Sequence, residues 1–200
     1  LIYRDDFDMN NFTFPDSNDD DYAIIVTIPK AHATLNNLIV DVKAGTIDLK
    51  SLSAIDAKVS GAANIDLSNM SAEHLEITGQ IAEISAELLS VSDQLVLDLA
   101  GGNANISGHS LGDIQVDVSM IGKVNLTLLG SARKDYSSSA KSNGGLPEDA
   151  IGLIETSGFI IDGERLKYDY TDNYSHAPGT ITINSDNFGP VEDVSIQFGK

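Results

Sequence analysis

Cysteine and tryptophan are absent from the 200-residue chain, and basic residues are scarce. Without cysteine, the chain has no disulfide framework, no thiol nucleophile and no cysteine-based metal site. Its 12 basic residues against 30 acidic ones give a net charge of −18, which makes nucleic acid and anionic lipid headgroups poor partners. Cations and basic surfaces are compatible with this charge.

Long apolar runs are missing too. No run approaches the roughly 18 apolar residues of a membrane span, and the first residues have no signal-like pattern. Because the chain begins at Leu1 rather than Met, we expect a processed or trimmed product, and a membrane anchor upstream of Leu1 is left open. A hydrophobic content of 42% in 200 residues suits one domain with a substantial core.

Aromatic residues are absent from residues 23–135, although the chain has 6 Tyr and 6 Phe in all. An interior filled only by Leu, Ile, Val and Ala must be narrow, because one large ring would interrupt evenly packed layers.

This aliphatic region repeats one phrase about five times. Each phrase has a run of alternating apolar and polar residues, a corner of small residues, and a second alternating run. The opening residues stand 17, 20, 20 and 19 positions apart, at Leu38, Ile55, Leu75, Leu95 and Ile114. The second-run markers follow in step at Ile47, Ile65, Ile84, Ile106 and Val124. Alternation is typical of strands, and a fixed period is typical of stacked repeats.

The sequence therefore predicts an all-β, single-domain β-solenoid, similar to a β-helix or β-roll. Its coils have about 19 residues with two short strands each, and its ends are capped. Stacked at about 4.8 Å, successive coils would align like side chains into ladders. An antiparallel β-sandwich also alternates, but it requires neither a constant period nor an aromatic-free middle.

The flanks differ from the repeats. Residues 1–21 are rich in Asp and predict a flexible or surface-hugging acidic arm, so we place the solenoid domain at residues 22–200. Residues 131–150 are polar with a Gly and Pro cluster, which predicts a protruding loop. Terminal coils need protection from edge pairing, and we expect Phe159, Phe188, Phe198 and the tyrosines near the C-terminus to form that cap.

Several phrases together resemble a bacterial adhesin-like family of unknown function found in cell-envelope proteins. They are VTIP, the repeated runs, DYSSSAK, GFIIDGERL and the late GTITI, and they span about residues 22 to 200. The resemblance implies an exported β-solenoid, often tethered to a membrane, without established enzymatic activity. It supplies no catalytic or binding residues. The chain departs from the family's small-residue corners where it has Lys43, Ala44 and Gly45.

Tyrosines alternating with acidic residues form the best binding candidate. The residues concerned are Tyr168, Tyr170, Tyr174, Asp169 and Asp172. Alternate tyrosines would share one strand face, and an aromatic platform beside carboxylates suits sugars or peptides. The alternative is that these tyrosines only cap the solenoid.

Asp16, Asn18 and Asp20 begin like a calcium-binding loop. The sixth position is Asp21 instead of the Gly needed for the turn, and the twelfth is Thr27 instead of Glu. We therefore favour a solvated acidic arm over a metal site, and leave weak divalent cation binding open. No cofactor is predicted.

The run Gly108-His109-Ser110-Leu111-Gly112 matches the G-x-S-x-G nucleophile elbow of hydrolases. That motif requires a helix after the serine, whereas DIQVDVSM predicts a strand. A hydrolase using Ser110 is thus the least favoured alternative.

We expect a non-catalytic interaction or adhesion module, extracellular or in the cell envelope, whose ligand is an unknown protein or glycan at the cell surface. The alternative is an accessory in envelope stress or signalling that docks a neighbouring membrane protein.

Overall fold

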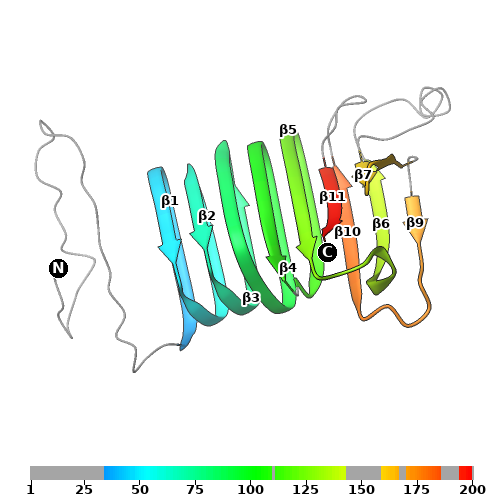
Figure 1. The fold of residues 1–200 in the computed structure, drawn as a ribbon. Coiled ribbons are helices and arrows are strands. Elements are labelled where there is room, and N and C mark those ends of the chain that lie inside the picture. The colour runs from blue at the N-terminus through cyan, green and yellow to red at the C-terminus, as the bar shows by residue number, and fades with distance from the viewer. Residues whose placement is uncertain (1–33, 110, 143–158, 167–169, 186–193, 200) are drawn as a thin grey trace, which may run out of the picture. The chain divides into compact units, whose positions relative to one another are not determined.

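The computed structural model describes residues 34–109, 111–142, 159–166, 170–185 and 194–199. These residues form an all-β fold, which confirms the predicted class (Figure 1). The strands are β1 Thr34–Lys50, β2 Ser53–Ser68, β3 Ser71–Gly79, β4 Ala82–His109, β5 Asp113–Leu129, β6 Tyr136–Ser142, β7 Phe159–Ile161, β8 Glu164–Arg165, β9 Tyr170–Asp172, β10 Gly179–Ser185 and β11 Val194–Gly199. A 3-10 turn, η3, covers Arg133–Asp135. Within the described ranges, no helix is long and apolar enough to cross a membrane.

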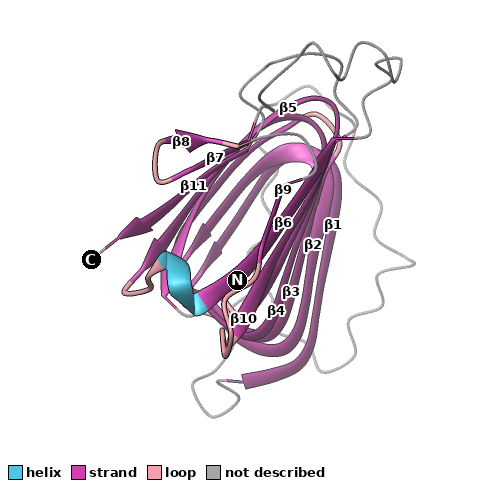
Figure 2. Ribbon diagram, turned by 90° about the vertical axis from the view of Figure 1, so that its right-hand side faces the viewer, coloured by secondary structure: helices cyan, strands magenta, loops and turns pink. Residues whose placement is uncertain are grey.

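Successive repeats pair in parallel and in register from β1 to β5. Leu75 pairs with Leu95, and Leu95 pairs with Ile114. Each repeat therefore lies directly on the one before it. Figure 2 looks along this stack and shows the long strands bending alike, so that the first and second runs of each repeat lie on either side of one core.

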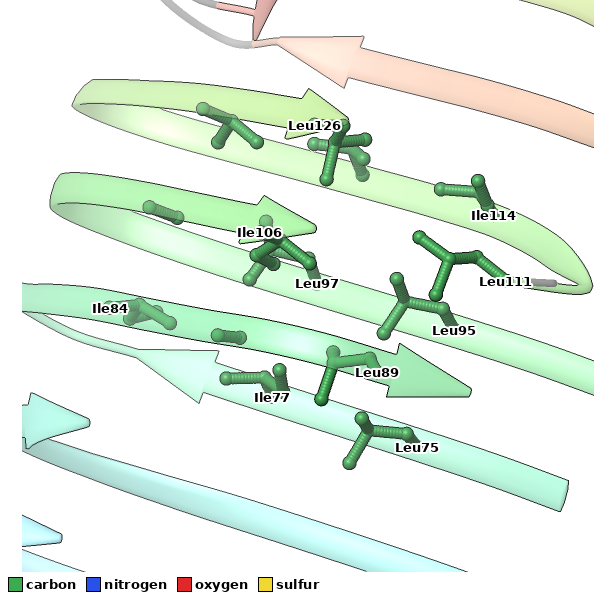
Figure 3. Close-up of a cluster of buried hydrophobic side chains, with 14 of the residues drawn as sticks. Leu75, Ile77, Ile84, Leu89, Leu95, Leu97, Ile106, Leu111, Ile114 and Leu126 are labelled. Atoms are coloured by element: carbon green, nitrogen blue, oxygen red, sulfur yellow. The ribbon is translucent and has the colours of Figure 1, made fainter. Parts of the chain in front are cut away.

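The core consists of the inward side chains of both runs. Leu75, Leu95 and Ile114 are buried and stack as one ladder, with Leu97 beside them (Figure 3). A strand turns alternate side chains to opposite faces, so the polar residues between these positions face outward. The buried hydrophobic side chains of β1–β5 are all Ala, Val, Leu or Ile, as the aromatic-free middle predicts.

Two of the predicted register markers are wrong. Leu38 pairs with Ala57 rather than with Ile55, and Ile55 is more than one-third exposed. Ile106 is also two residues out of step, because it pairs with Leu126. Around Ile55 the alternation is interrupted, since Ala54 and Ala57 are buried while Ile55 and Asp56 between them are exposed. At Ile106 the shift of two residues keeps the side chain on the buried face, so alternation alone could not fix the register there.

The last coils do not stack in sequence order. In β10, Ile181 pairs with Ile114 of β5 on one side and with Ser138 of β6 on the other. β11 likewise lies between β5 and β7. The C-terminal strands are thus inserted between the fifth coil and the strands β6 and β7, as Figure 1 shows for the orange β10 and red β11.

This order places the less aliphatic coil at the end of the stack. The inward residues of β6 are Tyr136, Ser138 and Ala140, all buried, whereas β10 contributes Ile181 and Ile183. A terminal repeat has only one neighbour and commonly differs from the inner ones, so the more polar coil is better tolerated there.

Part of the predicted protruding loop is wrong, because residues 136–142 form β6. The alternate residues Tyr136, Ser138 and Ala140 of this serine-rich run face the core. The rest of the loop, residues 143–150, and the acidic arm, residues 1–21, lie outside the described residues. Of the predicted capping rings, Phe159 is buried in β7 and Phe198 lies 6.0 Å from Tyr136 between ring centroids, whereas Phe188 is outside the described residues.

Gly102 marks a corner where two coils come very close. Its φ is +102°, and a Cβ built there would lie 2.0 Å from the carbonyl oxygen of Ala82 in the previous coil. Gly45 has a similar φ of +123°, but nothing lies within 4 Å of its Cβ position. A side chain at either glycine would strain the backbone, because both φ angles are positive. Only at Gly102 would it also clash with the neighbouring coil.

We therefore expect Gly102→Ala to lower the free energy of unfolding by about 1–3 kcal/mol more than Gly45→Ala does, since only the first substitution forces two coils apart. Urea denaturation of both variants would measure the difference. Equal losses of unfolding free energy in the two variants would show that the close approach of the two coils at Gly102 does not matter for stability.

Candidate functional site

Arg133 is at the centre of a polar cluster at the C-terminal end of the stack. Its Nη2 donates to the hydroxyl of Tyr170 at 2.6 Å and lies 3.6 Å from an Oδ2 of Asp172. Its Nη1 donates to Glu164 at 2.9 Å. The hydroxyl of Tyr170 in turn donates to Asp172 at 2.8 Å. One guanidinium thus ties η3 to β8 and to β9.

The pairing of β9 with β6 explains how this cluster forms. The two strands are antiparallel, with Ala140 opposite Tyr170 and Ser138 opposite Asp172. Tyr170 and Asp172 are alternate residues, so their side chains lie on one face of β9. That face meets Arg133, which follows β5 at the start of η3.

The electrostatics of the cluster favour protonated phenols and a charged guanidinium. Burial raises the pKa of Tyr170, and the hydrogen bond to Asp172 raises it further, against an opposing effect of Arg133. The hydrogen bond to Asp172 also raises the pKa of Tyr174. The contact with Glu164 raises the pKa of Arg133 above its ordinary value. Tyr170 and Tyr174 therefore stay protonated at neutral pH, and Arg133 stays charged.

Three of the five predicted binding residues come together here: Tyr170, Asp172 and Tyr174. Tyr168 and Asp169 lie outside the described residues. The expected open aromatic platform is not what the structure has at Tyr170, because this ring packs against the hydrophobic core and its hydroxyl is held within the chain. These contacts of Tyr170 are compatible with the capping alternative, and Tyr174 is half-exposed.

Sequence reasoning did not place Arg133 or Glu164 in this site. Arg133 is 37 positions from Tyr170 and 31 from Glu164. Their proximity depends on β9 folding back on β6, which local patterns do not encode. A weak signal was available, because Arg133 is one of very few arginines and comes just where the repeat ends.

The predicted metal candidates Asp16, Asn18 and Asp20 lie outside the described residues. Within the described part of the chain, no three His, Asp or Glu side chains are arranged to hold a metal ion.

Ser110 also lies outside the described residues, but its surroundings are described on both sides. β4 ends at His109, and β5 begins at Asp113. The residues after the serine therefore form a strand, whereas the nucleophile elbow of a hydrolase leads into a helix.

Among protein families, the family model Toastrack DUF4097 matches residues 4–145 of the chain. No curated protein and no solved structure matches the sequence significantly.

We predict that Arg133→Met lowers the free energy of unfolding by about 1–2 kcal/mol. The variant leaves Glu164 and Asp172 without their cation and frees β9 from η3. Lys134→Met in the same turn is the matched control, since Lys134 is exposed, and its effect should be within about 0.5 kcal/mol. Thermal and urea unfolding would measure both, and indistinguishable variants would argue against a structural role of the cluster.

A second prediction concerns alkaline pH. Because folding raises the pKa of Tyr170, the folded chain keeps this proton at pH values where the unfolded chain has lost it. This contribution to stability is complete below the ordinary tyrosine pKa of about 10 and is lost as pH rises through the folded pKa. Between about pH 9.5 and 11, unfolding free energy should fall more steeply for the natural chain than for Tyr170→Phe. Parallel curves of unfolding free energy against pH for the two proteins would refute a raised pKa of Tyr170 in the folded chain.

Proposed function

The chain belongs to the Toastrack DUF4097 family, which the model match over residues 4–145 establishes, and on that premise we propose that it is a non-catalytic interaction module. In this proposal the parallel stack is a β-solenoid displayed at the surface of a bacterial cell envelope. It binds a protein or glycan there and performs no chemistry on it.

The observation that carries the proposal is the in-register stacking of the coils. Stacking arranges the outward side chains in straight rows, and the side chains of one row contact each other from one coil to the next. Asn125 donates to Asn105 at 2.8 Å, and Asn103 donates to Glu83 at 2.8 Å. A surface that is already ordered loses little conformational entropy on binding, so it can hold a partner without rearranging.

The charge of the chain narrows the choice of partner. With a net charge of −18, electrostatic repulsion opposes binding to phosphate backbones and anionic membranes. A neutral glycan or a protein with basic groups meets no such barrier. This supports a role in contacting other molecules at the cell surface, either in adhesion or by docking a membrane protein of the envelope.

The test is a glycan array probed with the full chain and with Tyr174→Ala, because Tyr174 is the half-exposed ring beside the Arg133 cluster. We expect the full chain to bind at least one glycan class and the variant to bind it at least fivefold more weakly, owing to the lost ring contact. Thr171→Ala is the matched control, since Thr171 is exposed on the other face of β9.

Absence of glycan binding, or equal binding by both variants, would contradict an adhesive role for this end of the stack. Turnover of a generic ester that disappears in Ser110→Ala would contradict the non-catalytic assignment.

A further inference from the structure

A shallow groove crosses the outer face of β1, β2, β3 and β4, far from the Arg133 cluster in the order of strands. Its volume is about 230 Å³. The side chains along it are outward residues that stand in register: Ile39 beside Lys58, Lys58 beside Glu76, and Glu76 beside Val96. The four strands that carry the groove lie side by side in Figure 1.

The groove is apolar at both ends and charged in the middle. Ile39 at one end is 75% exposed, in the middle of a strand whose other outward residues are polar. Val96 lines the other end. Between them, Lys58 and Glu76 form an ion pair. A single exposed isoleucine is ordinary, but here two aliphatic side chains line one concave surface at either end of a row.

Asp56 and Glu76 line the groove together with Lys58 and His74, and Asp93 lies just beside it. The ring of His74 lies between two carboxylates, with Nδ1 3.0 Å from Asp56 and Nε2 2.6 Å from Asp93. Lys58, the lysine that lines the groove, is already paired with Glu76. A cation brought into the groove would therefore meet carboxylates that outnumber the basic groups.

An acidic row continues from the groove, formed by Asp98 of β4 and Asp117 of β5, which stand side by side in register. Burial raises the pKa of Asp98, and repulsion from Asp117 and Glu76 raises it further. Amide groups of Gln115 and Asn184 donate to Asp117, but no Lys or Arg of the described residues forms an ion pair with either aspartate. A cationic partner would relieve this repulsion.

We propose that the groove and the acidic row together dock an extended, basic peptide segment that presents aliphatic side chains and Lys or Arg side chains on the same face, at alternate positions of the peptide. The aliphatic side chains would contact Ile39 and Val96, and the cations would contact Asp98 and Asp117. This inference rests on the proposed function as an interaction module and assigns it a binding face and the chemistry of a partner.

The dimensions of the groove suit such a segment. Four strands at about 4.8 Å spacing span roughly 14 Å, which is the length of about four extended residues at 3.3–3.4 Å each. A second copy of the chain fits less well, because two molecules with a net charge of −18 repel one another. A bare metal ion or polyamine would not use the apolar ends.

The experiment titrates the full chain by calorimetry with a Lys–Leu peptide of sequence Leu-Ser-Leu-Ser-Lys-Ser-Lys, whose Leu and Lys side chains lie on one face when the peptide is extended. The same peptide with Glu in place of Lys is the probe of opposite charge. The double variant Asp98→Asn/Asp117→Asn should bind the Lys–Leu peptide at least tenfold more weakly. The matched control is Asp48→Asn/Asp66→Asn, a pair that also stands in register but on the second run of the coils. It removes the same charge and should change affinity less than twofold.

A second comparison tests the apolar contact. Ile39→Ser should weaken binding at least threefold, whereas Ile81→Ser, at a corner residue that is equally 75% exposed, should not. Equal losses in the two aspartate pairs would show that only net charge matters, and would overturn the proposal. Absence of Lys–Leu binding at millimolar peptide would overturn it too. If Tyr174-dependent glycan binding persists in that case, only this inference fails; if both fail, the interaction role fails with them.

Discussion

Parallel hydrogen bonding between consecutive repeats, held at one strand spacing, is the constraint on which this structure depends. It requires each inward position to carry a side chain that fits directly over the one below, as Leu75, Leu95 and Ile114 do. The same spacing arranges the outward side chains in rows, including Lys58 beside Glu76 and Asp98 beside Asp117. Core and surface are therefore ordered by one backbone geometry.

The C-terminal end of the stack is finished by a different kind of contact. Beyond β6 and β7 the described strands are short and antiparallel: three residues in β9 and two in β8. Arg133 joins both of them through Glu164 and Tyr170. Short strands leave little free edge for another chain to pair with, and the Arg133 cluster holds both of them in place.

Sequence periodicity was sufficient for the all-β class and for the approximate repeat, since alternation and constant spacing follow directly from stacked strands. It was insufficient for the exact register at Ile106, because a shift of two residues leaves the buried face unchanged. It also missed the strand at residues 136–142, whose inward Ser138 and Ala140 give little hydrophobic signal. The Arg133 cluster depends on pairings between distant strands, and no local pattern in the chain specifies these.

The insertion of β10 and β11 between β5 and the β6–β7 coil has a consequence for biosynthesis. β6 and β7 leave the ribosome before the two strands on which they stack. During translation the first five coils can accumulate one upon another, but the outermost coil must wait for the strands made after it. Completion of this end therefore waits until β10 and β11 have been synthesised, and a chain cut short before β10 would expose the ladder of β5 to solvent and to other nascent chains.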